Sequence, residues 1–249
     1  MRKSKKLIFI FILILLGIIL ALYLFIRAES EKLPEMNSSP AADQIADSMM
    51  MVLGKEGWDT LHFLQWVFKN KHQYLWNKPV NSVLIEWGGN RVMMNLDNQT
   101  GRAWKRSSEV GGREKENLMK KAWKMWCNDS FWMFAPFKAK DPGTTRTLVE
   151  VPAPGVFGLL VTYQSGGVTP GDHYLWILDH KYVPLGFKMW VSIIPIEGLY
   201  VSWDRWLTLD EGIKLSTFHE SKFFTSYISD VKSGVHYADF GYENDPFSL

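Results

Sequence analysis

The sequence contains a single cysteine, Cys127, among 249 residues. One thiol cannot form a disulfide within the chain, so a folded domain must be stabilised by an ordinary packed core. The chain is long enough to bury such a core. Disulfide-rich scaffolds are therefore excluded.

Motifs for metal binding and for common kinds of catalysis are also missing. The histidines show neither H-E-x-x-H nor a pair at i and i+4, no C-x-x-C occurs, and no serine lies in a G-x-S-x-G. Cys127 falls on the apolar side of an expected helix, where a buried, inert thiol is favoured over a nucleophile. The glycine-rich stretch 166–171 lacks the lysine of a P-loop and predicts a hairpin loop. We expect no metal, no cofactor and no catalysis, and a lipid or glycan hydrolase is the less favoured alternative.

Outside the N-terminal region, acidic residues slightly outnumber basic ones. Five of the 28 lysines and arginines lie at positions 2, 3, 5, 6 and 27, which leaves 23 basic and 26 acidic residues, a net charge of −3, for the rest of the chain. A mildly acidic domain without a basic cluster has no electrostatic footprint for nucleic acid or for an anionic membrane surface. We therefore expect no nucleic-acid partner.

Residues 7–26 form the one long apolar run, and it carries no charge. At about 1.5 Å per residue such a helix spans the ~30 Å hydrocarbon core of a bilayer. The run is longer than the hydrophobic region of a cleavable signal peptide, and neither a small-x-small cleavage site nor a cysteine for acylation follows it. Four basic residues precede the run and Arg27 alone follows it directly, so the positive-inside rule places the N-terminus in the cytoplasm. We predict a single-pass signal anchor in a bacterial inner membrane, with the domain in the periplasm.

Helical spacing is found in two further segments. Ser39 and Pro40 suit the N-cap and first position of a helix that Gly54 ends, and its apolar residues share one face. A second helix is predicted over residues 113–127, with apolar side chains on one side and lysines on the other.

Strand-like patterns occupy most of the remaining chain. Many of the expected strands are joined by short turns such as Gly88-Gly89-Asn90. The predicted strands are residues 58–68, 80–87, 91–96, 102–106, 145–151, 156–164, 173–178, 187–194, 199–209 and 213–219, with a further short strand expected at 223–228. The rest of the stretch 223–249 is unassigned.

These elements predict an α+β fold. We expect a strongly curved antiparallel sheet, an incomplete β-barrel of roughly nine or more strands, capped by two helices and preceded by the transmembrane helix. The predicted divisions are a cytoplasmic stub and signal anchor at 1–27, a linker at 28–39, and an exported half-barrel domain at 40–249.

The order of these elements resembles the Lol lipoprotein-carrier fold, in which helices cap an incomplete β-barrel whose concave interior holds acyl chains. The stretch 128–143, NDSFWMFAPFKAKDPG, is similar to a central signature of an uncharacterised group of exported Bacteroidetes proteins related to that fold. The hairpin at 173–190, with YLWILD before its turn, is similar to paired strands near the end of such carriers. Lol carriers are soluble or lipid-anchored, whereas this chain is expected to be fixed by a helix. The resemblance therefore implies a lipid-like or other apolar ligand, without the lipoprotein-trafficking role.

Large apolar side chains are abundant, with twelve tryptophans and eleven methionines. Rigid indoles on a strongly curved sheet leave gaps, and flexible methionines can line such an irregular cavity. For each candidate residue the alternative is plain core packing. The candidate ligand-binding residues lie on the strands, on the second helix and in the 128–143 stretch: Trp87, Met94, Trp123, Trp126, Trp132, Phe134, Trp176 and Met189.

We therefore predict a membrane-anchored periplasmic module that binds a lipid-like or other hydrophobic ligand. The alternative is a non-catalytic structural or interaction protein of the cell envelope, with a filled core and a protein partner that the sequence does not identify. An open apolar cavity favours the first function, and a solid core favours the second.

Overall fold

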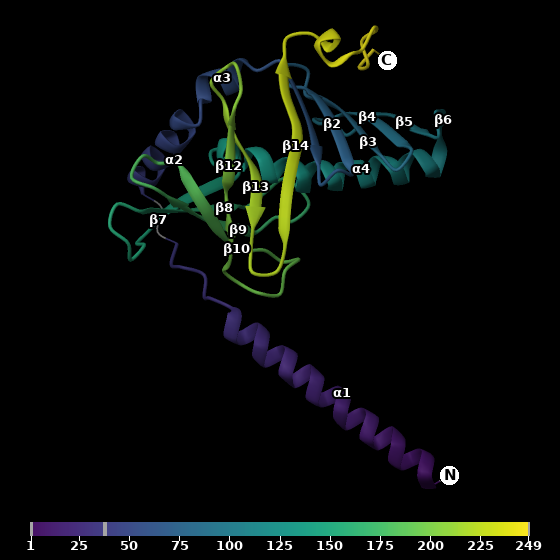
Figure 1. Ribbon diagram of the computed structural model, residues 1–249, viewed down its shortest axis with the longest axis vertical. Coiled ribbons are helices and arrows are strands. Elements are labelled where there is room, and N and C mark those ends of the chain that lie inside the picture. Colours follow the sequence, from purple (N-terminus) through teal and green to yellow (C-terminus); the bar gives the residue numbers. More distant parts are fainter. Residues whose placement is uncertain (1, 37–38, 249) are drawn as a thin grey trace.

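The computed structural model describes residues 2–36 and 39–248. It has the predicted α+β fold, with curved antiparallel sheets that do not close into a barrel (Figure 1). The larger sheet has nine strands in the order β12-β13-β14-β1-β2-β3-β4-β5-β6. Its strands are β1 (Phe63–Phe68), β2 (His72–Asn77), β3 (Ser82–Trp87), β4 (Asn90–Asn95), β5 (Gly101–Lys105), β6 (Ser108–Val110), β12 (Asp204–Thr208), β13 (Lys214–Glu220) and β14 (Thr225–Gly234).

A second sheet of five strands has the order β11-β10-β9-β8-β7. Its strands are β7 (Thr144–Val149), β8 (Phe157–Tyr163), β9 (Asp172–Leu178), β10 (Pro184–Trp190) and β11 (Leu199–Ser202). The predicted single strand at 199–209 is wrong, because the chain changes sheets at Trp203, between β11 and β12. The indole of Trp203 is buried against Trp176 and His219, with ring centroids 4.8 and 4.6 Å away. One fully buried side chain thus joins the two sheets.

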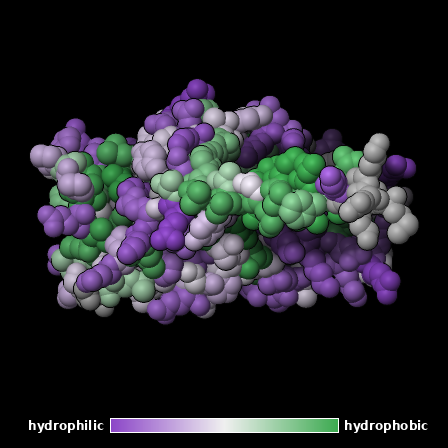
Figure 2. Space-filling model, turned by 90° about the horizontal axis from the view of Figure 1, so that it is seen from below, coloured by the Kyte–Doolittle hydropathy of each residue, from purple (hydrophilic) through white to green (hydrophobic). Residues whose placement is uncertain are grey.

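The N-terminal helix α1 (Arg2–Glu29) projects from the domain (Figure 1). Its segment Lys6–Glu29 has a mean hydropathy of 3.3 and is not buried, so it is long and apolar enough to span a membrane. Figure 2 shows a continuous hydrophobic band from the middle to the right of the view, where this helix lies.

The helix α2 (Pro40–Val52) has the predicted ends. The Ser39 side chain accepts a hydrogen bond from the Ala42 amide, and Gly54 adopts a left-handed conformation just beyond the helix. The short helix α3 (Lys55–Thr60) follows at once, so the prediction that a strand begins at Trp58 is wrong. Trp58 is instead buried by stacking on Phe137, at 4.4 Å between ring centroids.

The helix α4 (Gly112–Phe134) continues beyond the predicted end at Cys127 and is followed by the 3-10 turn η1 (Ala135–Lys138). It runs from the β6 edge of the larger sheet towards the five-stranded sheet (Figure 1). The extension is held by Asp129, which is 2% exposed. Its carboxylate lies 2.6 Å from both Nδ1 of His72 and the hydroxyl of Tyr74 on β2. These contacts outweigh the weak helix propensity of the Asn-Asp-Ser sequence.

Both sheets contribute to one main core. Along β3 and β4 the residues Val83, Ile85, Val92 and Met94 face this core, as the alternation predicted. The intervening residues form a second cluster on the outer face, which the C-terminal segment covers. That cluster contains Phe63, Leu75, Leu84 and Met93 with Tyr237 and Phe240 of the 3-10 turn η2 (Tyr237–Phe240), and Tyr242 and Phe247.

The segment between α1 and α2 is not a free stalk. Residues 30–36, here called the docked linker, cross the outer face of the five-stranded sheet. The Glu31 amide donates to the Glu197 carbonyl (2.8 Å), and the Trp190 indole donates to the Glu31 carbonyl (2.8 Å). Leu33 packs against the cluster that Trp190 forms with Leu160 and Leu175. At Gly198 (φ 72°) an added Cβ would lie 2.7 Å from the Glu31 Cβ, so the close approach requires glycine there. The helix α1 is therefore attached to the domain by tertiary contacts as well as by the chain.

We expect Leu33→Ser to lower the free energy of unfolding by about 1–2 kcal/mol, because it removes a packed leucine from the outer face of the sheet. Thermal unfolding of the full-length protein in the same detergent would measure this. Lys32→Ser is the matched control, since Lys32 is exposed. Equal midpoints for the two variants would contradict docking of the linker.

Candidate functional site

A partly open cavity of about 600 Å³ lies between α4, the two sheets and the loop between β8 and β9. Its volume is within the ~300–1,000 Å³ typical of small-molecule sites. Residues of α4 and η1 form one wall. Trp58 of α3, the end of β2 and the turn after β2 form a second, and the loops 165–169 and 191–194 border a third.

Aromatic side chains form most of the interior. Trp76 stacks on Phe134 at 5.4 Å with an interplanar angle of 16°, and Trp126 contacts both rings at 5.5 and 5.9 Å. Phe131 packs on Tyr174 of β9 at 4.5 Å. These rigid rings pack on one another and line the cavity without filling it.

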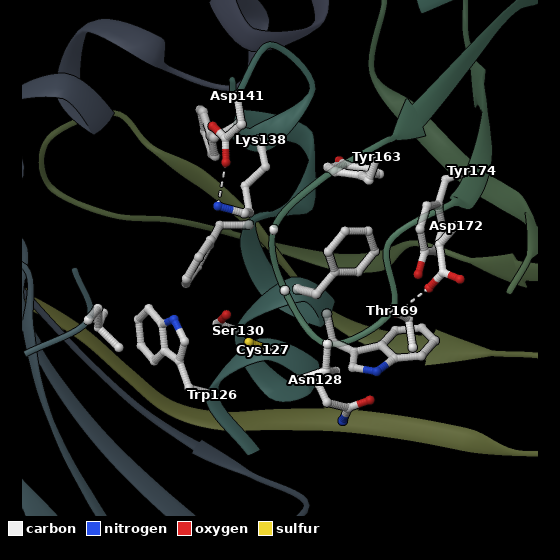
Figure 3. Close-up of a pocket in the computed structure, with 18 of the residues that line it drawn as sticks. Trp126, Cys127, Asn128, Ser130, Lys138, Asp141, Tyr163, Thr169, Asp172 and Tyr174 are labelled. Carbon is white, nitrogen blue, oxygen red and sulfur yellow. Dashed lines mark hydrogen bonds and ion pairs between the residues drawn. The ribbon is translucent and has the colours of Figure 1, made fainter. Parts of the chain in front are cut away.

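Polar groups gather on the side of the cavity opposite Trp126 (Figure 3). Lys138 and Asp141 form an ion pair at 2.5 Å. Asp172 accepts hydrogen bonds from the Thr169 hydroxyl and from the Ser192 amide. The cavity is thus amphipathic, with an aromatic region and a polar region.

The hydroxyl of Tyr163 belongs to the polar region and is buried without a hydrogen-bond partner among the described residues. Burial raises the pKa of Tyr163, and the nearby Tyr174 and Asp141 raise it further. For Tyr174, burial raises the pKa and the Asp172 carboxylate adds to the effect. Both phenols are therefore protonated at neutral pH. A buried hydroxyl without a partner is costly, so Tyr163 can stabilise a ligand that accepts its hydrogen bond.

Cys127 lines the cavity from α4. Burial raises the pKa of its thiol to about 11, although Lys138 acts in the opposite direction. The thiol is therefore protonated at neutral pH and is a poor nucleophile. No histidine is among the described residues that line the cavity, and in the same part of the chain no cluster of three or more His, Cys, Asp or Glu side chains could hold a metal ion.

The structure brings together five of the eight predicted site residues and separates the other three. Trp123, Trp126, Trp132, Phe134 and Met189 line the cavity. Trp87, Met94 and Trp176 lie in the main core outside it. Trp176 and Met94 are fully buried, and Trp87 packs below the ammonium of Lys121 at 5.6 Å.

Sequence reasoning missed the polar region and part of the aromatic wall. Three cavity residues were not predicted. Trp58 was assigned to a strand, Trp76 lies on β2, which was not predicted, and Phe137 follows the unpredicted extension of α4. Asp141 and Asp172 lie 31 positions apart in sequence, and only the pairing of β8 with β9 brings the second to the cavity. No spacing rule connects these residues.

His219 is a buried titratable group behind the cavity wall. Its ring packs on Trp132, which lines the cavity, at 5.4 Å. Burial lowers the pKa of His219 from 6.5 to about 4, against the smaller raising effect of backbone hydrogen bonds. The imidazole is therefore neutral at pH 7.

Two tryptophans of the same helix should respond differently to substitution. Trp126 contacts four aromatic rings, whereas Trp123 is half-buried and has no aromatic partner among the described residues. We expect Trp126→Ala to cost about 3–5 kcal/mol of stability, and Trp123→Asp to cost much less while weakening binding of a long-chain fluorescent probe. Trp176→Ala is the matched core control, which should lose stability like Trp126→Ala. A large stability loss for Trp123→Asp with unchanged probe affinity would place Trp123 in the core instead.

Because of His219, the domain should become less stable as the pH is lowered below 6.5. Between pH 6.5 and about 4 the unfolded chain binds a proton at this residue that the folded chain does not take up. The free energy of unfolding therefore decreases as the pH falls through this range, by up to about 3 kcal/mol. We expect His219→Gln to reduce this pH dependence relative to wild type, and His180→Gln, at an exposed position, to leave it unchanged. Chemical denaturation at several pH values would measure both.

No protein-family profile matches the sequence, and no curated protein is significantly similar to it. Among solved structures, the chain is similar to the crystal structure of a DUF1329 family protein from Desulfovibrio piger at 1.75 Å resolution. The two chains are 12% identical, and the aligned region covers 80% of this chain and 95% of that chain with a TM-score of 0.39. A likeness at this level is too distant to support a functional assignment.

Proposed function

We propose that the protein is a membrane-anchored binding module for an amphiphilic, lipid-like ligand. The observation that carries the proposal is the cavity of about 600 Å³ with an aromatic region and a separate polar region. An acyl chain would lie against the aromatic surface that Trp126, Trp76 and Phe134 form. Its polar group would meet Tyr163, Lys138 and Asp172 on the opposite side (Figure 3).

The charges of the polar region favour a ligand group that can both donate and accept hydrogen bonds. Lys138 contributes three N–H donors, Asp141 and Asp172 contribute acceptors, and the free hydroxyl of Tyr163 can do either. Because the Lys138–Asp141 pair is at 40% and 39% side-chain exposure, its geometry can adjust to a ligand at small cost.

The placement of the protein in the cell is part of the proposal. The apolar helix α1 would anchor the chain in a bacterial inner membrane, with its basic N-terminus in the cytoplasm and the domain in the periplasm. A domain held in this way cannot carry a lipid between membranes. An anchored domain can, however, retain, sense or pass on a ligand at the membrane that holds it.

Catalysis on such a ligand is the less favoured reading. The two carboxylates that line the cavity are already engaged, Asp141 with Lys138 and Asp172 with Thr169 and the Ser192 amide. The Cys127 thiol, with its pKa of about 11, has no histidine beside it among the described cavity residues. A docking protein without a ligand is disfavoured for a different reason, since it would leave an aromatic cavity unfilled at a cost in dispersion energy.

Filling the cavity tests the proposal. We expect Cys127→Trp to place an indole in the cavity and to weaken binding of a long-chain fluorescent probe at least about tenfold, or ~1.4 kcal/mol. Lys124→Trp adds the same side chain to an exposed position of α4 and is the matched control. The full-length protein would be measured in lipid nanodiscs, so that detergent does not occupy the cavity.

A second measurement keeps the test informative if Cys127→Trp folds poorly. In the wild type, the probe should slow alkylation of Cys127, the only thiol in the chain. Organic extraction and mass spectrometry of the purified protein should also yield a co-purified amphiphile. No probe binding by the folded wild type, together with an unprotected thiol, would refute the binding function and leave an interaction protein.

A further inference from the structure

The end of α1 contacts the main core of the domain and two of its loops. Ile26 packs on the main core, and Phe25 meets Phe223 edge to face at 6.1 Å. Glu29 pairs with Lys222 at 2.6 Å. The Ser30 hydroxyl accepts a hydrogen bond from the Glu197 amide at 3.2 Å. The loop 191–198 and the turn 221–224 therefore lie directly beside the end of the apolar helix, as Figure 1 shows.

The strand register places the opening of the cavity at this same end. Trp190 pairs with His173, Met189 with Leu199, and Tyr163 with Asp172. The loops 164–171 and 191–198 thus leave the five-stranded sheet at one end, which the docked linker crosses. Most of the exposed residues that line the cavity belong to these two loops, namely Ser165, Gly166, Gly167, Val168 and Ile193. The opening is therefore bordered by the loop that contacts the anchor.

The exposed side chains at this end are unusual for a surface in water. Ile193 is 71% exposed, the highest value for any large hydrophobic side chain in the described part of the chain, and Phe223 is 43% exposed. Lys222 is 61% exposed and lies 5.8 Å from the Phe223 ring. An aliphatic and an aromatic side chain beside a lysine are the combination found where proteins meet the membrane interface, because the lysine stem and the ring bury apolar surface while the ammonium stays in water.

We propose that the loop 191–198 and the turn 221–224 contact the surface of the bilayer that α1 spans, and that the cavity takes its lipid from that bilayer through the adjacent opening. The second part rests on the proposed binding function, whereas the membrane contact rests only on the proposed anchoring by α1. The bilayer is favoured over a protein partner because α1 continues into the same contacts without a free linker. A lipid leaving the bilayer would then pass from an apolar medium to an aromatic cavity with little exposure of its chain to water.

Site-specific fluorescence quenching tests the membrane contact. In full-length protein carrying Cys127→Ser, a single cysteine would be introduced as Ile193→Cys, Phe223→Cys, Val80→Cys or Val235→Cys and labelled with an environment-sensitive fluorophore. Val80 and Val235 are matched controls because each is 53% exposed and lies at the far end of the domain. In vesicles of phosphatidylethanolamine and phosphatidylglycerol with nitroxide-labelled lipids, we expect quenching at 193 and 223 to be several-fold stronger than at 80 and 235. Equal quenching at all four positions would overturn the contact.

A transfer measurement tests the route. Phe223 does not line the cavity, so Phe223→Asp should slow uptake of a long-chain probe from vesicles several-fold while its affinity for the same probe added from solution stays unchanged. Val80→Asp should alter neither. If the wild type binds the probe but Phe223→Asp takes it up from vesicles at the wild-type rate, the route is wrong and the binding function stands. If no variant binds the probe, the binding function fails and the quenching result alone decides the membrane contact.

Discussion

The position of α4 between the two sheets is the constraint on which the rest of the domain depends. The buried carboxylate of Asp129 fixes it, through His72 and Tyr74 of β2 and the neighbouring amide of Asn128. A buried carboxylate without such partners is costly, so any sliding or rotation of the helix would break the contacts that offset its desolvation. The helix is therefore held in one register along the sheet. Its C-terminal residues then present Trp126 and Phe134 to the larger sheet and Phe131 to the smaller one.

The cavity follows from that arrangement and from the rigidity of the side chains involved. Indole and phenyl rings have few rotamers, and they meet as stacked or edge-to-face pairs that cannot be compressed further. Two stacked pairs, Trp58 on Phe137 and Trp76 on Phe134, form one rigid wall of the cavity. Trp203 holds the smaller sheet against the core on the other side. Flexible aliphatic residues would collapse into such a space, whereas these rings leave it available.

Local signals in the sequence were sufficient where local forces decide the structure. Ser39, Pro40 and Gly54 define α2 by capping chemistry, and the alternation in β3 and β4 assigns Val83 and Ile85 to the core face. The same alternation places Leu84 and Met93 outside, where nothing local indicates that the C-terminal segment covers them. The extension of α4 was missed for a similar reason, because Asn128 and Asp129 disfavour a helix by propensity and only tertiary contacts reverse that preference. The change of sheet at Trp203 is likewise a consequence of packing.

For the candidate site too, the sequence pattern identifies interior residues, whereas tertiary packing determines which of them line the cavity. Periodicity assigns Trp126, Met94 and Trp176 equally to an interior face, but it carries no information on where the interior is filled. Met94 and Trp176 are fully buried in the main core, whereas Trp126 lines the cavity. The linker is a further case, since a polar stretch with one proline is typical of a free stalk. Its docking uses the Glu31 main chain and Leu33, and neither is informative until it is placed against the outer face of the five-stranded sheet. Because these contacts join the domain to α1, the fold itself sets where the opening of the cavity lies relative to the end of the apolar helix.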